Sequence, residues 1–212
     1  MLYNPVRQLV IDSSNKCSLQ CSKCAREYFK RTKQRVPGEL LTVERFEKLI
    51  DYFDELVEFC GQISDPVMNP NLPKFLSILY EKKIPSVVST AASYRSLDWY
   101  KNTYELNPDT EWIFGLDGLP EESHLYRKNQ DGPKIFEAMK LASSMGIKVV
   151  WQYIVFRYNE DHIEQAIKMA EENNIIFELN ISSRWDGPDD PLMPLNPKYV
   201  KKHGTERKDI FS

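Results

Sequence analysis

The stretch PKIFEAMKLASSMGIKVVWQYIVFRYNEDHIEQAIKMAEENNIIFELNI, residues 133–181, decides the fold. Apolar residues recur at helical spacing over 133–145 and again over 161–173, which predicts two amphipathic helices. Runs rich in β-branched and aromatic residues fill 147–156 and 175–181 and predict two strands. Helices and strands in strict alternation indicate right-handed crossovers between parallel strands. The stretch therefore predicts an α/β protein built on a parallel sheet.

The first half of the chain repeats this alternation with weaker signals. Further strands are predicted at residues 6–12, 56–60, 84–90 and 111–116. Further helices are predicted after Thr42, a good N-cap residue, and at residues 72–81 and 96–103. About six strand–helix units fit into the 212 residues, whereas a closed eightfold barrel typically takes roughly 250 residues. The pattern alone leaves open whether the sheet is doubly wound or a curved partial barrel.

The composition changes after residue 185. Four prolines recur at every third position, a spacing that places them on one edge of a polyproline II helix: Pro188, Pro191, Pro194 and Pro197. We predict one α/β domain over residues 1–185, followed over 186–212 by a short Pro-rich strap and a polar tail. We expect the strap to lie across the domain rather than to dock a partner.

Charge and hydrophobicity are those of a globular protein. The chain carries 28 Lys and Arg against 31 Asp and Glu, a net charge of −3, and 42% of its residues are hydrophobic. It has no apolar run of the roughly 18 residues that span a membrane, and residues 1–10 lack the pattern of a secretory signal. We therefore expect a cytoplasmic protein without a membrane partner. The slightly acidic balance argues against nucleic-acid binding.

Three of the four cysteines form a CxxxCxxC loop directly after the first predicted strand. Cys17, Cys21 and Cys24 lie within eight residues, which indicates metal or redox chemistry rather than a disulfide framework. A structural zinc site needs four ligands, whereas three thiolates suit an iron–sulfur cluster with one free position. The spacing favours the cluster, and a zinc-stabilised binding module without turnover is the alternative. Cys60 stands alone and is predicted to be a buried core thiol.

The loop resembles that of the radical S-adenosylmethionine (SAM) superfamily, and the likeness extends from residue 6 to about residue 181. It implies a partial (β/α)6 TIM-like barrel with a [4Fe–4S] cluster on Cys17, Cys21 and Cys24, and SAM on the fourth iron. It also implies reductive cleavage of SAM to methionine and a 5′-deoxyadenosyl radical that takes hydrogen from a peptide, protein or small-molecule substrate. The implied electron donor is a protein such as flavodoxin or ferredoxin.

Other segments are similar to the superfamily's contacts with the methionine end of SAM. Ser64 and Asp65 stand at the place of a Gly-Gly-Glu-Pro segment that supports the SAM amino group. Gly115 and Asp117 belong to a segment like the superfamily's Ser-Leu-Asp-Gly. Arg127 ends a His-x-x-Arg stretch found in the peptide-modifying branch, where the arginine pairs with the SAM carboxylate.

The same resemblance places other residues beside the ribose and adenine of SAM. Ser89 and Thr90 precede a turn that resembles the superfamily's ribose-binding turn, and Phe156 and Asn159 match the end of a strand that flanks the adenine and ribose. Lys23 stands where the superfamily has an aromatic residue near the adenine.

The chain also departs from the superfamily's pattern. Tyr28 or Phe29 is expected to supply the ring that Lys23 does not, and Asp65 lacks the two preceding glycines. The substituted Gly-Gly-Glu-Pro segment, together with Ala91 in place of the superfamily's Asn after Thr90, suggests a further alternative, a relic that binds SAM without acting on a second substrate. No cysteine follows Cys60, so an auxiliary cluster of the type found in C-terminal extensions is not expected.

Overall fold

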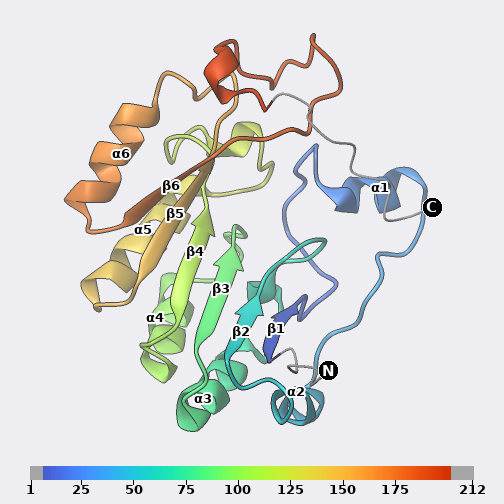
Figure 1. Ribbon diagram of the computed structural model, residues 1–212, viewed down its shortest axis with the longest axis vertical. Coiled ribbons are helices and arrows are strands. Elements are labelled where there is room, and N and C mark those ends of the chain that lie inside the picture. The colour runs from blue at the N-terminus through green and yellow to red at the C-terminus, as the bar shows by residue number, and fades with distance from the viewer. Residues whose placement is uncertain (1–6, 202–212) are drawn as a thin grey trace, which may run out of the picture.

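The computed structural model describes residues 7–201, in which six parallel strands form one open sheet (Figure 1). The strands follow chain order across the sheet: β1 (Gln8–Ile11), β2 (Leu56–Phe59), β3 (Ser86–Thr90), β4 (Glu111–Gly115), β5 (Val149–Ile154) and β6 (Ile176–Asn180). Right-handed βα units in this order curve into the wall of a barrel. The predicted partial (β/α)6 barrel is confirmed as the fold class, and the doubly wound alternative is not observed.

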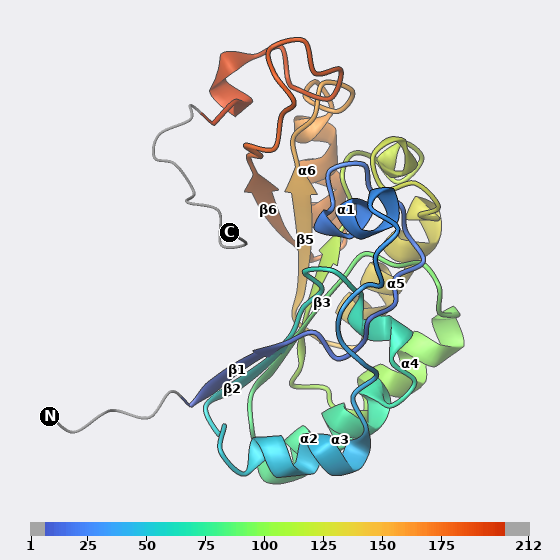
Figure 2. The ribbon, with the colours of Figure 1, turned by 90° about the vertical axis from the view of Figure 1, so that its right-hand side faces the viewer.

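Helices cover one face of the sheet and leave the other face open (Figure 2). They are α1 (Ala25–Arg31), α2 (Val43–Ile50), α3 (Leu72–Lys82), α4 (Leu97–Leu106), α5 (Gly132–Ser144) and α6 (Ile163–Glu172). Three short 3-10 helices are η1 (Pro66–Met68), η2 (Ser123–Leu125) and η3 (Pro197–Tyr199). Five helices are close to those expected, including α2, which Thr42 caps by accepting a hydrogen bond from Arg45 N at 3.3 Å. Helix α1 was not expected.

The core lies between the sheet and its helices. Aromatic side chains dominate it: the ring of Phe46 on α2 lies 5.7 Å from that of Phe59 on β2 and 4.4 Å from that of Phe75 on α3. All three are fully buried, and each contributes about 1.5–3 kcal/mol through burial. This packing holds the helical face rigid, so that the loops at the carboxyl ends of the strands start from defined positions.

The prediction that Cys60 is a buried core thiol is wrong. Side chains alternate along a strand, and Val57 and Phe59 of β2 point into the helical core. Cys60 follows Phe59 and therefore faces the open side of the sheet, where its thiol is half-buried.

The prolines of the C-terminal strap do not form the expected polyproline II helix. Residues 186–193 bend through successive turns and 197–199 form η3. The bends arise because Asp190 turns inward and accepts hydrogen bonds from the backbone N–H groups of Asp186 and Leu192, at 2.8 Å and 2.9 Å. An extended helix cannot make these local bonds. The division at residue 185 stays a prediction.

Parts of two expectations lie outside the described residues: Val6 of the first strand and the polar tail from residue 202. Between residues 7 and 201, the helices are too short or too polar to cross a membrane.

Candidate functional site

The three cysteines of the CxxxCxxC loop lie together after β1. Cys17, Cys21 and Cys24 are free, partly buried thiols that line one small cavity, which they share with Ile63 and Ser64. The cysteine loop follows β1, and Ile63 and Ser64 follow β2. The cavity therefore lies at the carboxyl ends of the strands, the face that carries the chemistry in βα barrels.

Two anchors hold the cysteine loop in place. Leu19, between the first two cysteines, is buried in the hydrophobic core. Arg26 donates hydrogen bonds from Nη1 to the carbonyl oxygens of Asn15 at 2.8 Å and Ile63 at 2.9 Å. Arg26 thus ties the loop both to its own beginning and to the turn after β2. Cys24 caps α1 at its N-terminus, since its sulfur accepts a hydrogen bond from Arg26 N at 3.4 Å.

Burial controls the acidity of two of the thiols. It raises the pKa of Cys17 to about 12, an effect to which Asp65 adds. It raises the pKa of Cys21 to about 11, although Arg127 opposes the shift. Such thiols stay protonated at neutral pH, so a bound metal must displace their protons and supply the positive charge that stabilises the thiolates.

The donor set fits an iron–sulfur cluster better than a single zinc ion. Structural zinc needs four converging ligands, and the described part of the chain contains no group of three or more His, Cys, Asp or Glu side chains placed to hold a metal ion. A [4Fe–4S] cluster that keeps one iron free takes three thiolates from the protein. Cys17, Cys21 and Cys24 line one cavity and can supply them.

The turn after β2 brings Ser64 and Asp65 to the cysteine loop. A Cβ atom at Gly61 would lie 1.9 Å from the carbonyl oxygen of Ser64, so the turn requires glycine at this position. The hydroxyl of Ser64 donates to Oδ1 of Asp12 at 2.7 Å. The backbone N–H of Asp65 donates to the carbonyl oxygen of Lys16 at 2.9 Å. These bonds hold the turn against the start of the loop.

The carboxylate of Asp65 is buried and bonded to its own chain. Oδ1 accepts hydrogen bonds from the hydroxyl of Thr90 at 2.8 Å and from Val67 N at 3.1 Å. Oδ2 accepts from Ala91 N and Ala92 N, both at 2.9 Å. Burial raises the pKa of Asp65, and these donors oppose the shift. Asp65 therefore links the turn after β2 to the end of β3.

Arg127 lies against the end of β4, where its side chain is only 14% exposed. Its Nε lies 2.7 Å from Oδ2 of Asp117, whose Oδ1 accepts a hydrogen bond from Ile154 N at 2.9 Å. A Cβ atom at Gly115 would lie 2.6 Å from Nη2 of Arg127, so the absent side chain makes room for the guanidinium. Burial opposes the charge on Arg127, but Asp117 and Cys21 raise its pKa and keep it a cation.

Backbone and amide contacts connect these segments. Gln20 N in the cysteine loop donates to the carbonyl oxygen of Lys128 at 3.1 Å. The side-chain amide of Gln130 donates to the carbonyl oxygens of Ala91 at 2.7 Å and Gly115 at 2.9 Å. The ends of β3 and β4 and the cysteine loop thus form one connected layer.

Phe156 and Asn159, which follow β5, are both buried. Phe156 packs against another ring, and Asn159 makes hydrogen bonds to its own segment of the chain. The ring of Phe156 lies 4.4 Å from that of Tyr126. The amide of Asn159 accepts from Phe156 N at 2.7 Å and donates to the carbonyl oxygen of Ile154 at 3.0 Å. Ser89 is half-buried on the open side of β3.

The structure therefore brings some of the predicted residues together and keeps others apart. The cavity is lined by four of them: Cys17, Cys21, Cys24 and Ser64. A second group gathers at the end of β4, where Arg127 packs against the other two residues and its charge opposes the raised pKa of Cys21: Gly115, Asp117 and Arg127. The others do not line that cavity: Asp65, Ser89, Thr90, Phe156 and Asn159.

The ion pairs of Lys23 were not expected from the sequence. The ammonium group of Lys23 pairs with the carboxylates of Asp186 and Asp190. The sequence did contain a signal for these pairs. Lys23 stands at a position where the superfamily has an aromatic residue, and a lysine that is buried there needs a counterion. Tyr28 and Phe29 pack edge to face on α1, which has no buried residue, and their expected role as a substitute ring stays a prediction.

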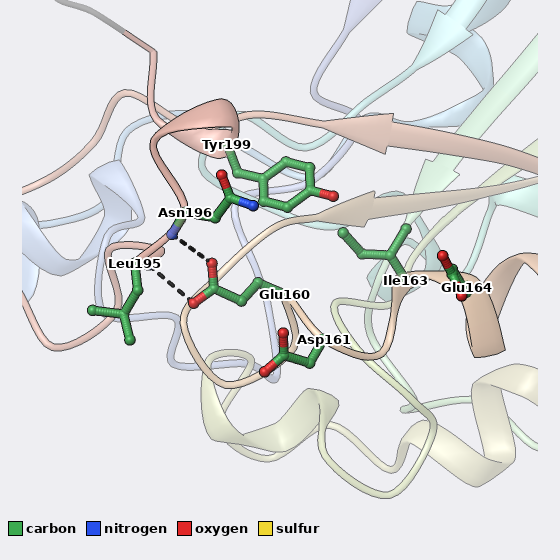
Figure 3. A pocket seen from close by; sticks show the side chains of 7 residues that line it. All are labelled: Glu160, Asp161, Ile163, Glu164, Leu195, Asn196 and Tyr199. Atoms are coloured by element: carbon green, nitrogen blue, oxygen red, sulfur yellow. Dashed lines mark hydrogen bonds between the residues drawn. The ribbon is translucent and has the colours of Figure 1, made fainter.

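A larger cavity than that of the cysteines lies between the loop that follows β5 and the C-terminal strap (Figure 3). It has a volume of about 540 Å³ and is lined by Glu160, Asp161, Ile163, Glu164, Leu195, Asn196 and Tyr199. None of the predicted site residues lines it. Glu160 uses both carboxylate oxygens to accept hydrogen bonds from Leu195 N and Asn196 N, at 3.0 Å and 2.9 Å.

Comparison with protein families adds to this geometry. The model of the radical SAM superfamily matches residues 11–170, three quarters of the chain. No curated protein matches the sequence.

Solved structures share the fold. SuiB from Streptococcus suis superposes with a TM-score of 0.68 at 18% identity, over 95% of this chain and 43% of SuiB. The enzyme anSMEcpe with bound AdoMet (SAM) gives 0.66 at 18% identity, over 92% of this chain and 55% of its own. Other structures of these two proteins contain the precursor peptide SuiA and the peptide Kp18Cys. The chain spans less than half the length of SuiB and about half that of anSMEcpe.

Proposed function

The chain belongs to the radical SAM superfamily, and from this membership we propose that it is an enzyme that cleaves SAM reductively. The observation that carries the proposal is the cavity shared by Cys17, Cys21 and Cys24 at the carboxyl ends of six parallel strands. The three cysteines would hold a [4Fe–4S] cluster, which would supply, once reduced by an electron donor, the electron for splitting SAM into methionine and a 5′-deoxyadenosyl radical that would remove hydrogen from the substrate.

In this proposal the residues around the cavity hold the methionine end of SAM. The Arg127 guanidinium attracts the SAM carboxylate, and Asp117 and Gly115 keep it beside Cys21. Ser64 contributes from the turn after β2. Because the carboxylate of Asp65 is occupied by four donors of its own chain, we assign it the task of shaping that turn.

The residues at the ends of β3 and β5 serve the ribose and adenine in the same proposal. Ser89 presents a hydroxyl on the open side of the sheet. Thr90 and Asn159 shape the adjoining turns through their hydrogen bonds. Phe156 supplies an apolar wall at the end of β5.

We propose a peptide or a small molecule as the substrate. The peptide-bound structures of SuiB and anSMEcpe favour the first. The open face of the sheet supports it too, because no helix covers this face in the described part of the chain (Figure 2). An electron donor such as flavodoxin or ferredoxin completes the reaction, and the free clustered thiols suggest a cytoplasmic setting.

Single substitutions of the cysteines test the proposal. In anaerobic assays with SAM and dithionite, Cys17→Ala, Cys21→Ala and Cys24→Ala should each abolish formation of 5′-deoxyadenosine, while circular dichroism shows an intact fold. Cys60→Ala is the matched control and should retain activity. Release of 5′-deoxyadenosine by any of the three variants at the wild-type rate would refute the proposal.

A further inference from the structure

An ion pair joins the cysteine loop to the C-terminal strap. The Nζ atom of Lys23 lies 2.5 Å from Oδ2 of Asp190 and also contacts Asp186. The side chain of Asp190 is 1% exposed and that of Lys23 is 12% exposed, whereas that of Asp186 is 86% exposed. The pair between Lys23 and Asp190 is therefore the one shielded from water, where charge pairing is strongest.

The strap cannot move freely around Asp190. Arg157, just after β5, holds it with three hydrogen bonds: from its backbone N–H to the carbonyl oxygen of Leu192, from Nε to that of Met193, and from Nη2 to that of Asp190. Glu160 binds the next part of the strap through two backbone N–H groups. Asp190 is thus a fixed point to which Lys23 attaches.

The two joined segments follow the two edges of the open sheet. The cysteine loop follows β1 and the strap follows β6, and the two lie side by side at the top of the molecule (Figure 1). β1 and β6 do not pair with each other, so they do not close the barrel themselves. The contact between Lys23 and Asp190 bridges the opening at the end that carries the cysteines.

We infer that Asp190 is a positioning residue for the cluster, and that it acts through Lys23 on the adjacent ligand Cys24. The inference rests on the proposed function. Its physical basis is that substitution of residues that orient metal ligands typically weakens metal binding by about 10–100-fold. The strap therefore belongs to the cofactor site, which it closes from the β6 side.

A double substitution separates positioning from stability. Lys23→Met leaves the shielded carboxylate of Asp190 without its cation, and Asp190→Asn leaves Lys23 only the exposed carboxylate of Asp186. Each single substitution therefore lowers stability. The double variant K23M/D190N removes both charges, and its unfolding temperature should lie closer to that of the wild type than those of the single variants do. If the pair positions the loop, the double variant still loses iron to a chelator about tenfold or more faster than the wild-type holoprotein, and its electron paramagnetic resonance spectrum with SAM is altered.

Two further variants serve as controls. Lys23→Arg keeps a charge at this position and should largely restore iron retention. Lys48→Met removes an ion pair with Glu44 on the exposed surface of α2 and should leave iron retention unchanged. The inference fails if the double variant retains iron like the wild type, or if K48M loses iron as fast as the double variant.

The experiments distinguish failure of the proposed function from failure of the inference about Asp190. If the wild-type protein binds no cluster, that function is refuted, and hydrogen exchange then tests the ion pair without metal. Backbone amides of residues 18–24 should exchange faster in K23M/D190N than in the wild type. Equal exchange rates would show that Asp190 does not position the loop.

Discussion

At residue 115 the side chain is a single hydrogen atom, and the position of Arg127 depends on it. The guanidinium occupies the space that a Cβ atom would take and pairs with Asp117. Among residues 7–201, Arg127 pairs with one carboxylate, and a guanidinium with one such partner keeps donors available for a second anion. This is the residue-scale basis for assigning Arg127 to the SAM carboxylate.

Gly115→Ala should therefore weaken SAM binding more than it weakens folding. The added methyl group displaces Arg127 and costs on the order of 1–3 kcal/mol of binding, as for a charge-assisted hydrogen bond. Anaerobic titration of the reconstituted protein measures the change in Kd. 5′-Deoxyadenosine, which lacks the carboxylate, should bind both proteins equally. Equal SAM affinity in wild type and variant would contradict the assigned role of Arg127.

Sequence patterns found the residue types of this site but not the use of each side chain. The likeness to His-x-x-Arg singled out Arg127, whose charge opposes the raised pKa of Cys21, and its role toward SAM stays a prediction. Asp65 was also predicted, yet its carboxylate is saturated by Thr90, Ala91 and other donors of its own chain. The direction of a side chain after a turn depends on distant backbone, and a local motif does not contain that information.

At the scale of elements, the cysteine loop and α1 form one unit that depends on Arg26. Helix α1 has seven residues and buries none of them, so propensity and burial alone barely sustain it. Its N-terminus rests on Cys24, and Arg26 bonds it to Asn15 and Ile63. The sequence did not predict α1, because a helix without an apolar stripe carries no periodic signal.

Arg26→Met should loosen this unit. It removes two hydrogen bonds from a charged donor, and we expect iron loss to a chelator to accelerate by about tenfold. Arg31→Met, on the last turn of the same short helix, is the matched control and should behave like the wild type. Identical iron retention in R26M and the wild type would show that the loop holds its shape without Arg26.

At the scale of the whole molecule, the strap is bound to the barrel by three side chains. Lys23, Arg157 and Glu160 all contact it. The sequence predicted that a strap lies over the domain, and six alternating units predicted the sheet correctly. The proline spacing predicted a polyproline II helix, but the strap forms turns instead. The contacts of Asp190 with the distant Lys23 and with the backbone of Asp186 override the local preference of the prolines.

Truncation after residue 185 should lower the unfolding temperature by on the order of 5–10 °C, because it leaves Lys23 and Arg157 without their partners. Thermal unfolding followed by circular dichroism measures the shift, with a chain ending at residue 201 as the control. An unchanged unfolding temperature would support the boundary at residue 185 as a true domain limit.

The most direct test of the central claim is anaerobic reconstitution of the whole chain with iron and sulfide, followed by addition of SAM and dithionite. We predict about four irons per chain, carried by Cys17, Cys21 and Cys24, and release of 5′-deoxyadenosine with methionine. A bound cluster that leaves SAM intact would indicate a relic of the superfamily. A protein that binds zinc and no sulfide would contradict the account.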